Sequence, residues 1–70
     1  MATVTVAARE LRKLPVVCRQ TALSRANIYR LVKSGEFPAP VKLGLRASAW
    51  VGAEVDAWIA QRIELRDKAA

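Results

Sequence analysis

Length, composition and charge set the first limits on this chain. Its 70 residues are 53% hydrophobic and carry a net charge of +6, enough for one small domain. It has no apolar run near the roughly 20 residues of a membrane span, which excludes a spanning helix. Its single Cys excludes an internal disulfide, and the absence of His excludes a His-based metal site. Residues 1–48 carry +7 and residues 49–70 carry −1, which favours a polyanionic partner over a merely basic soluble protein.

The first residues predict a tail and a short extended segment. Residues 1–10, MATVTVAARE, lack the apolar core and cleavage pattern of a signal peptide, so we expect a flexible tail and a cytoplasmic location. Leu11–Leu14 is expected to be extended and to pin the helix that follows. We interpret Arg9, Arg12 and Lys13 as a basic tail that adds general attraction and contacts no base.

A first helix is predicted over about Pro15–Thr21, because Pro suits the first turn of a helix. Leu14, Val17 and Cys18 are expected to point inward at spacings of three and four, and Cys18 is expected to be a small core residue rather than a reactive thiol. A tight turn follows at Ala22, where many turns of this kind carry Gly because the backbone angle is left-handed.

The second helix is predicted from the cap at Ser24 to a C-terminal Gly35. Three apolar residues at spacings of three and four share one face, namely Ile28, Leu31 and Val32. The opposite face comprises Ala26, Arg30 and Lys33, flanked by Asn27 and Tyr29. Such a layout is typical of a helix-turn-helix whose second helix enters a DNA groove.

A β-hairpin is predicted after this helix. Two prolines in residues 37–40 exclude helix, and Phe37 is expected to fold back onto the second helix near Leu31 and Val32. Strands are expected over Val41–Leu43 and Ala47–Trp50. The turn between them, Gly44–Arg46, places a cation at its tip, as in a wing. Trp50 is expected to anchor the hairpin, with Val41 and Leu43 as its neighbours.

A last helix is predicted from about Ala53 to near Asp67, with Gly52 at its cap. Its packing face is Val55, Trp58, Ile59 and Arg62. The domain is therefore expected over residues 11–66, followed by a loose end at residues 67–70. The expected fold class is mainly α with a small β-hairpin: a winged helix-turn-helix of three short helices plus a wing.

The order of these pieces resembles a known family. The segments LSRANIYRLVKSGEFPAPVKLG, a tryptophan after the second wing strand and EVDAWI are similar, in that order, to the AlpA-like regulators of phages and genomic islands. That family is related to excisionases and, more distantly, to MerR-type winged helix-turn-helix proteins. The chain departs from its pattern at Ala22, where Gly is frequent, and at Val51-Gly52, where a polar or charged residue is common.

Eight residues are the expected DNA contacts. Arg30 and Lys33 have the reach for base edges or phosphates, and the resemblance places a further contact at Arg25. Asn27 either pairs with adenine or is a solvated helix residue, and Tyr29 either donates to a phosphate or packs half-buried. The remaining three are the cap Ser24, whose phosphate contact is secondary, Arg46, expected in an A·T-narrowed minor groove, and Lys42, either a backbone contact or a solvated strand charge.

These expectations favour a non-enzymatic protein that binds double-stranded DNA without a cofactor, as a transcriptional regulator or a recombination directionality factor. Self-association on repeated sites and an integrase partner are expected with it. The alternative is a protein-interaction module of the antitoxin or anti-repressor kind, which uses the basic face against an acidic partner. Two patterns that would indicate an enzyme are absent from the sequence: a paired carboxylate in an apolar setting and a glycine-rich phosphate cradle.

Overall fold

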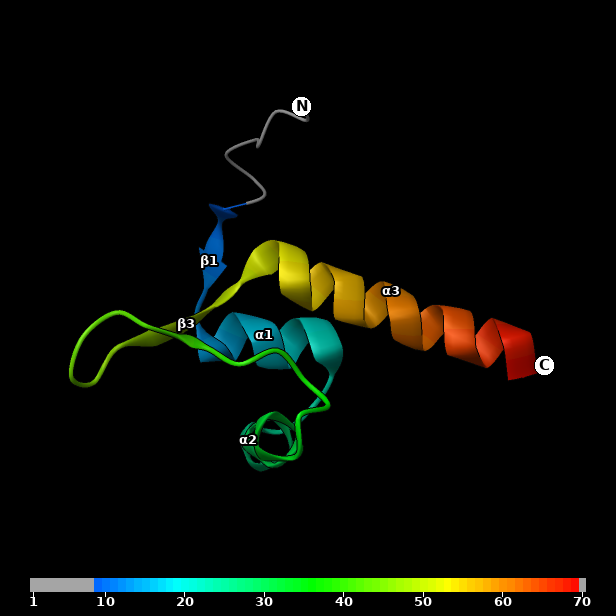
Figure 1. Ribbon diagram of the computed structural model, residues 1–70, viewed down its shortest axis with the longest axis horizontal. Coiled ribbons are helices and arrows are strands. Elements are labelled where there is room, and N and C mark those ends of the chain that lie inside the picture. Colours follow the sequence, from blue (N-terminus) through cyan, green and yellow to red (C-terminus); the bar gives the residue numbers. More distant parts are fainter. Residues whose placement is uncertain (1–8, 70) are drawn as a thin grey trace.

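Three helices surround a small antiparallel sheet in the computed structural model, which describes residues 9–69 (Figure 1). The elements follow in chain order as β1 (Leu11–Arg12), α1 (Leu14–Thr21), α2 (Arg25–Ser34), β2 (Val41–Lys42), β3 (Ser48–Val51) and α3 (Gly52–Ala69). Residues 1–8 of the expected flexible tail lie outside the described residues. The expected fold class, mainly α with a wing, is confirmed.

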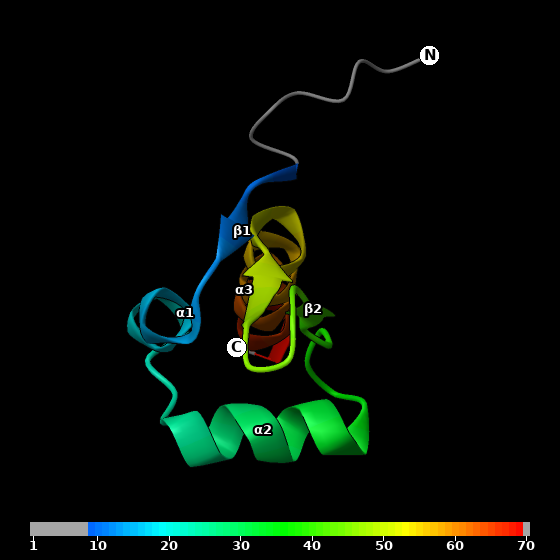
Figure 2. The same cartoon turned by 90° about the vertical axis from the view of Figure 1, so that its left-hand side faces the viewer.

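The sheet has the order β1-β3-β2, with β3 in the centre. On one side Val41 pairs with Ala49, which forms the predicted wing, and on the other Arg12 pairs with Trp50. The segment expected to be extended at Leu11–Leu14 is therefore a two-residue strand, and Leu14 already belongs to α1. In Figure 2 the three strands run side by side above α2, which crosses below them.

The local signals in α2 act as the sequence predicts. The Ser24 hydroxyl accepts a hydrogen bond from the Asn27 amide at 3.1 Å, which caps the helix start. Gly35 ends the helix at a φ of 82°, a left-handed angle that glycine adopts without steric cost. The amide of Phe37 then donates to the Leu31 carbonyl at 3.2 Å, so the chain folds back under α2 as expected.

The three helices, the central strand β3 and the loop after α2 each contribute one residue to the core cluster. This buried cluster is Val17, Ile28, Phe37, Trp50 and Val55. Leu31, Val32 and Cys18 pack against it from the side. The indole N–H groups are both satisfied, since Trp50 donates to the Pro38 carbonyl at 2.8 Å and Trp58 to the Glu36 carbonyl at 2.7 Å. The two tryptophans therefore fix the loop between α2 and the wing to the rest of the fold.

The expected neighbours of Trp50 are wrong. Val41 and Leu43 are largely exposed, whereas Trp50 is buried among the helices. The register explains the difference, because Val41 opposes Ala49 and therefore shares the sheet face of Ala49, whereas Trp50 is on the other face. In addition, β2 begins at Val41, one residue after the position that would oppose Trp50. Trp50 instead lies opposite Arg12 of β1, with its ring directed at the helical core.

The last helix is also longer than expected. It is 18 residues long, begins at Gly52 rather than after a Gly52 cap, and continues through Ala69, beyond the end expected near Asp67. Gly52 is buried, and a Cβ there would lie 2.7 Å from Nε of Arg12, so this position needs glycine for the close approach. In Figure 1 the C-terminal half of α3 extends past α1 and α2.

Candidate nucleic-acid interface

The outward face of α2 is where most of the predicted contact residues lie. Arg30 and Lys33 are exposed along it and Arg25 is exposed at the start of the helix, while Ile28 on the opposite face is fully buried. Because one face carries the packing and the other carries the cations, α2 presents its charges outward from a fixed support. Arg30 and Lys33 therefore lie on the exposed face, as the helical periodicity predicts.

A polar pair spans one turn of this face. The Arg30 guanidinium donates to the Asn27 side-chain oxygen at 3.1 Å. The backbone N–H of Asn27 donates in turn to the Ser24 hydroxyl that caps the helix. The contact restrains the long Arg30 side chain near the start of the helix. Asn27 thus has a structural partner, and the readout of adenine by Asn27 stays a prediction.

Tyr29 lies at the edge of this face and is 43% exposed. Its ring is 6.0 Å from that of Trp50, centroid to centroid, at an interplanar angle of 59°. This tilted contact on a buried tryptophan gives Tyr29 the packing role that the sequence analysis left open. Its contact with a phosphate stays a prediction.

The wing carries the other two predicted residues. Lys42 lies on β2 and Arg46 in the bend that follows Leu43, and both are exposed. The amide of Leu43 donates to the Ala47 carbonyl at 2.7 Å, which closes the loop at its base. Figure 2 shows the tip of this loop in front of the sheet and above the middle of α2. A second surface with cationic side chains thus lies beside the first.

The wing tip also holds a residue that the sequence analysis missed. Leu45 is fully exposed, at 103% of its reference area. The signal was present, because an apolar side chain occupies a turn where polar residues are usual. The sequence pattern predicts this segment only as a turn that carries Arg46.

Ion pairing divides the cations of the molecule into two groups. Within residues 9–69, Arg12, Arg66 and Lys68 each have a carboxylate partner. In the same range, no carboxylate lies within 4.0 Å of the other nine cations. Five of the nine lie on α2 and the wing, namely Arg25, Arg30, Lys33, Lys42 and Arg46, and the other four are Arg9, Lys13, Arg19 and Arg62. The positive field on this side is therefore not neutralised by the protein itself.

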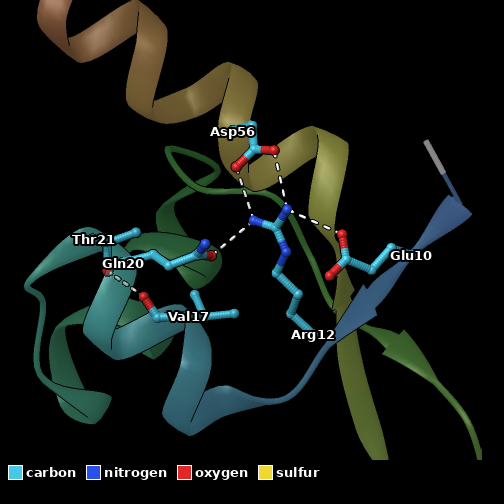
Figure 3. Close-up of polar contacts among 6 residues, drawn as sticks. All are labelled: Glu10, Arg12, Val17, Gln20, Thr21 and Asp56. Carbon is cyan, nitrogen blue, oxygen red and sulfur yellow. Dashed lines mark hydrogen bonds and ion pairs between the residues drawn. The ribbon is translucent and has the colours of Figure 1, made fainter. Parts of the chain in front are cut away.

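Arg12 has a different role from the one expected. Its guanidinium donates to Asp56 at 2.8 and 3.1 Å, to Gln20 at 2.7 Å and to Glu10 at 3.2 Å (Figure 3). With its side chain only 12% exposed, it connects β1, α1 and α3 and is not part of a basic tail. The hydrogen bond to Arg12 lowers the pKa of the Asp56 carboxyl below its ordinary value, and the same bonds raise the pKa of Arg12.

No group of three or more His, Cys, Asp or Glu side chains within residues 9–69 is placed to hold a metal ion. None of the helices there combines the length and the apolar character that crossing a membrane requires.

The two consecutive short helices, the wing and the unpaired cationic face together define a winged helix-turn-helix module. The model of a protein family described as "Prophage CP4-57 regulatory protein (AlpA)" matches residues 9–63, and the chain belongs to this family. The resemblance noted in the sequence is thereby confirmed.

Two curated relatives are similar over most of the chain. Uncharacterized protein ORF88 of Enterobacteria phage P4 is 45% identical over 56 residues, which cover 80% of this chain and 64% of that protein. The DNA-binding transcriptional activator AlpA of Escherichia coli strain K12 is 34% identical over 59 residues, covering 76% and 84%. This chain thus spans less than two thirds of the phage P4 protein. No solved structure gives a significant match.

Proposed function

We propose that this protein is a regulator that binds double-stranded DNA, with α2 in the major groove and the wing on the adjacent backbone and minor groove. The main observation in support of this proposal is that the cations on α2 and the wing have no carboxylate partner within residues 9–69. The phosphate backbone would supply the missing negative charge. The relative from Escherichia coli, by its name a DNA-binding transcriptional activator, supports the same function.

Each of the eight residues has a role in this proposal, and that of Ser24 is to cap α2 and, secondarily, to contact a phosphate. Arg30 and Lys33 contact base edges or phosphates, and Arg25 contacts DNA at the start of the helix. Tyr29 donates to a phosphate from the edge of the face, while Lys42 and Arg46 follow the neighbouring backbone. Asn27 positions Arg30 through the 3.1 Å hydrogen bond and contacts an adenine. The proposed role is non-enzymatic and needs no cofactor.

The test is a comparison of two arginine variants on duplex DNA. Arg30→Ala removes a cation from α2, and we expect its dissociation constant to rise roughly tenfold to a hundredfold, because an Arg that contacts a base is worth about 1–3 kcal/mol. Arg66→Ala is the matched control, since Arg66 lies at the far end of α3 and pairs with Asp67 at 2.8 Å. Fluorescence anisotropy at fixed salt measures both constants.

Equal affinities for Arg30→Ala and the parent would contradict the assignment of α2 as the recognition helix. Parent protein that binds no duplex but binds an acidic protein partner would instead favour the protein-interaction module. Circular dichroism on each variant separates lost contacts from lost folding. Salt-dependent binding in the parent is part of the expected result, because phosphate contacts release counterions.

The biological role of the binding divides into two proposals with the same chemistry. As a transcriptional regulator the protein occupies a promoter, and as a recombination directionality factor it occupies repeated sites beside a recombination core, together with an integrase. One module of this size buries only about 600–1,000 Å² on DNA, so we propose that copies bind neighbouring sites together. A footprint on the DNA that flanks the gene distinguishes the roles: a protected promoter supports regulation, and protected direct repeats support recombination.

A further inference from the structure

The wing carries a row of apolar side chains that the core does not use. Exposure increases towards the tip, from 39% at Val41 and 50% at Leu43 to 103% at Leu45. These residues alternate along the chain with positions that include the cations Lys42 and Arg46. An exposed apolar side chain close in sequence to two unpaired cations is unusual on a protein surface. The cations favour an anionic partner, and the apolar side chain favours a partner with an apolar interior.

The tip is held in place by the strands behind it. The Leu43 amide bonds to the Ala47 carbonyl at 2.7 Å, and the returning strand is anchored by the buried Ala49 and Trp50. Leu45 therefore projects from a supported hairpin, although no part of the core needs its side chain. Because the two ends of the loop are already fixed in the free protein, less backbone freedom is lost when Leu45 is inserted elsewhere.

We propose that Leu45 enters the minor groove beside the site of α2 and wedges between two base pairs, so that it kinks the duplex. This inference rests on the proposed function. A minor groove about 6 Å wide does not admit a two-stranded hairpin, but it admits one side chain from the tip of a hairpin. Leucine is among the residues that proteins insert between base steps, and Arg46 next to it can hold the flanking phosphates.

Insertion of Leu45 would give the protein a preference for certain DNA sequences, although the Leu45 side chain has no polar group to read a base. Pyrimidine–purine steps unstack more easily than others, so the protein should favour sites that place such a step under the wing. The duplex should bend by roughly 20–90° away from the inserted side chain, towards the major groove. The bend would bring more of the DNA backbone against the cations of α2 and the wing.

Three leucine variants test the wedge on a short duplex taken from the footprint of the parent protein. Leu45→Ala removes the wedge, Leu45→Met retains it, and Leu65→Ala is the control, because Leu65 is an exposed leucine on α3. Energy transfer between dyes at the two ends of the duplex reports the bend. 2-Aminopurine placed at each base step under the wing reports unstacking by a rise in fluorescence.

We expect Leu45→Ala to bind about fivefold more weakly, equivalent to about 1 kcal/mol, and to lose most of the bend and of the 2-aminopurine signal. Leu45→Met and Leu65→Ala should resemble the parent. The thermal midpoint of Leu45→Ala should be unchanged, since the side chain touches no core residue.

The outcomes separate this inference from the proposed function. Parent protein that binds the duplex without bending it, or Leu45→Ala that bends it as the parent does, overturns the wedge and leaves DNA binding intact. If Leu45→Ala changes only the sedimentation of the free protein, Leu45 takes part in a contact between protein molecules. That result also overturns the wedge. If the parent binds no duplex at all, the proposed function fails and the wedge fails with it.

Discussion

Ala22 shows how one residue carries the geometry of the turn between α1 and α2. Its backbone has a φ of 61° and a ψ of 21°, the left-handed conformation that the sequence analysis associated with glycine at this position. Neighbouring bonds hold it there: the Thr21 hydroxyl donates to the Val17 carbonyl at 2.8 Å and accepts from the Leu23 amide at 3.3 Å. The turn therefore forms despite the steric cost of the alanine Cβ.

Ala22→Gly should stabilise the protein. Removing the strain of the left-handed conformation should raise the free energy of unfolding by about 1–2 kcal/mol. The greater freedom of glycine in the unfolded chain should lower it by about 0.4–1 kcal/mol. We expect the free energy of unfolding in urea to rise by about 0.5–1 kcal/mol. Ala60→Gly, in the exposed interior of α3, is the control and should lower it by about 1 kcal/mol. A loss of stability for Ala22→Gly would contradict the strain at this turn.

At the scale of elements, the Arg12 cluster determines how β1, α1 and α3 meet. The bonds of Arg12 to Gln20 and Asp56 join two helices through one guanidinium, and Gly52 leaves room for it (Figure 3). A second connection is the Gly52 amide, which donates to the Glu10 carbonyl at 2.7 Å. The start of α3 is thus fixed to the N-terminal strand by both side chain and backbone.

The cluster makes stability depend on pH in the acid range. The folded pKa of Asp56 is lowered by its hydrogen bond to Arg12, so the pair stabilises the fold above the unfolded pKa of 3.8, and this contribution is lost as the pH falls through the folded value. We expect the thermal midpoint of the parent to fall between about pH 5 and pH 2. Asp56→Asn should show a smaller fall over this range.

Asp67→Asn serves as the control for this measurement, because the pair of Asp67 with the adjacent Arg66 lies on exposed helix surface and joins no separate elements. It should follow the acid profile of the parent. If Asp56→Asn follows the parent as closely as Asp67→Asn does, the Arg12–Asp56 pair contributes nothing to the acid dependence. Differential scanning fluorimetry across the pH series is sufficient to separate the profiles.

Elements set by local signals were predictable from the sequence, and those set by distant partners were not. The cap at Ser24 and the glycine at Gly35 lie within the helix they delimit, so the bounds of α2 followed from them. The partner of Arg12 lies 44 residues away, where no spacing rule applies, and its charge alone resembled that of a tail. The neighbours of Trp50 depended on the register of β2 and β3, which alternation does not fix over two residues.

The candidate site divides in the same way. Helical periodicity placed Arg30 and Lys33 on the exposed face of α2, because burial of Ile28 on the other face decides the orientation. The exposure of Leu45 depends instead on where the whole wing projects from the sheet. Only the assembled fold shows that no other element covers this leucine.

For the whole molecule, the separation of paired from unpaired cations matters more than the net charge of +6. Arg66 and Lys68 lie on α3 and pair with acidic residues of the same helix, whereas the cations of α2 and the wing pair with no carboxylate of residues 9–69. Partly neutralised charges release few counterions on binding. The salt dependence of DNA binding should therefore follow the number of unpaired cations in contact rather than the total.

Lysine variants test this distinction directly. Each phosphate contact contributes about 0.9 to the slope of the logarithm of affinity against the logarithm of salt concentration. Lys42→Ala should therefore lower the magnitude of the slope by about 1 and weaken binding similarly on all sequences. Lys68→Ala is the matched control: Lys68 pairs with Glu64 at 3.9 Å on α3, and its removal should leave the slope unchanged. Binding isotherms over a salt series give both slopes, and equal slopes for the two variants would show that the wing touches no phosphate through Lys42.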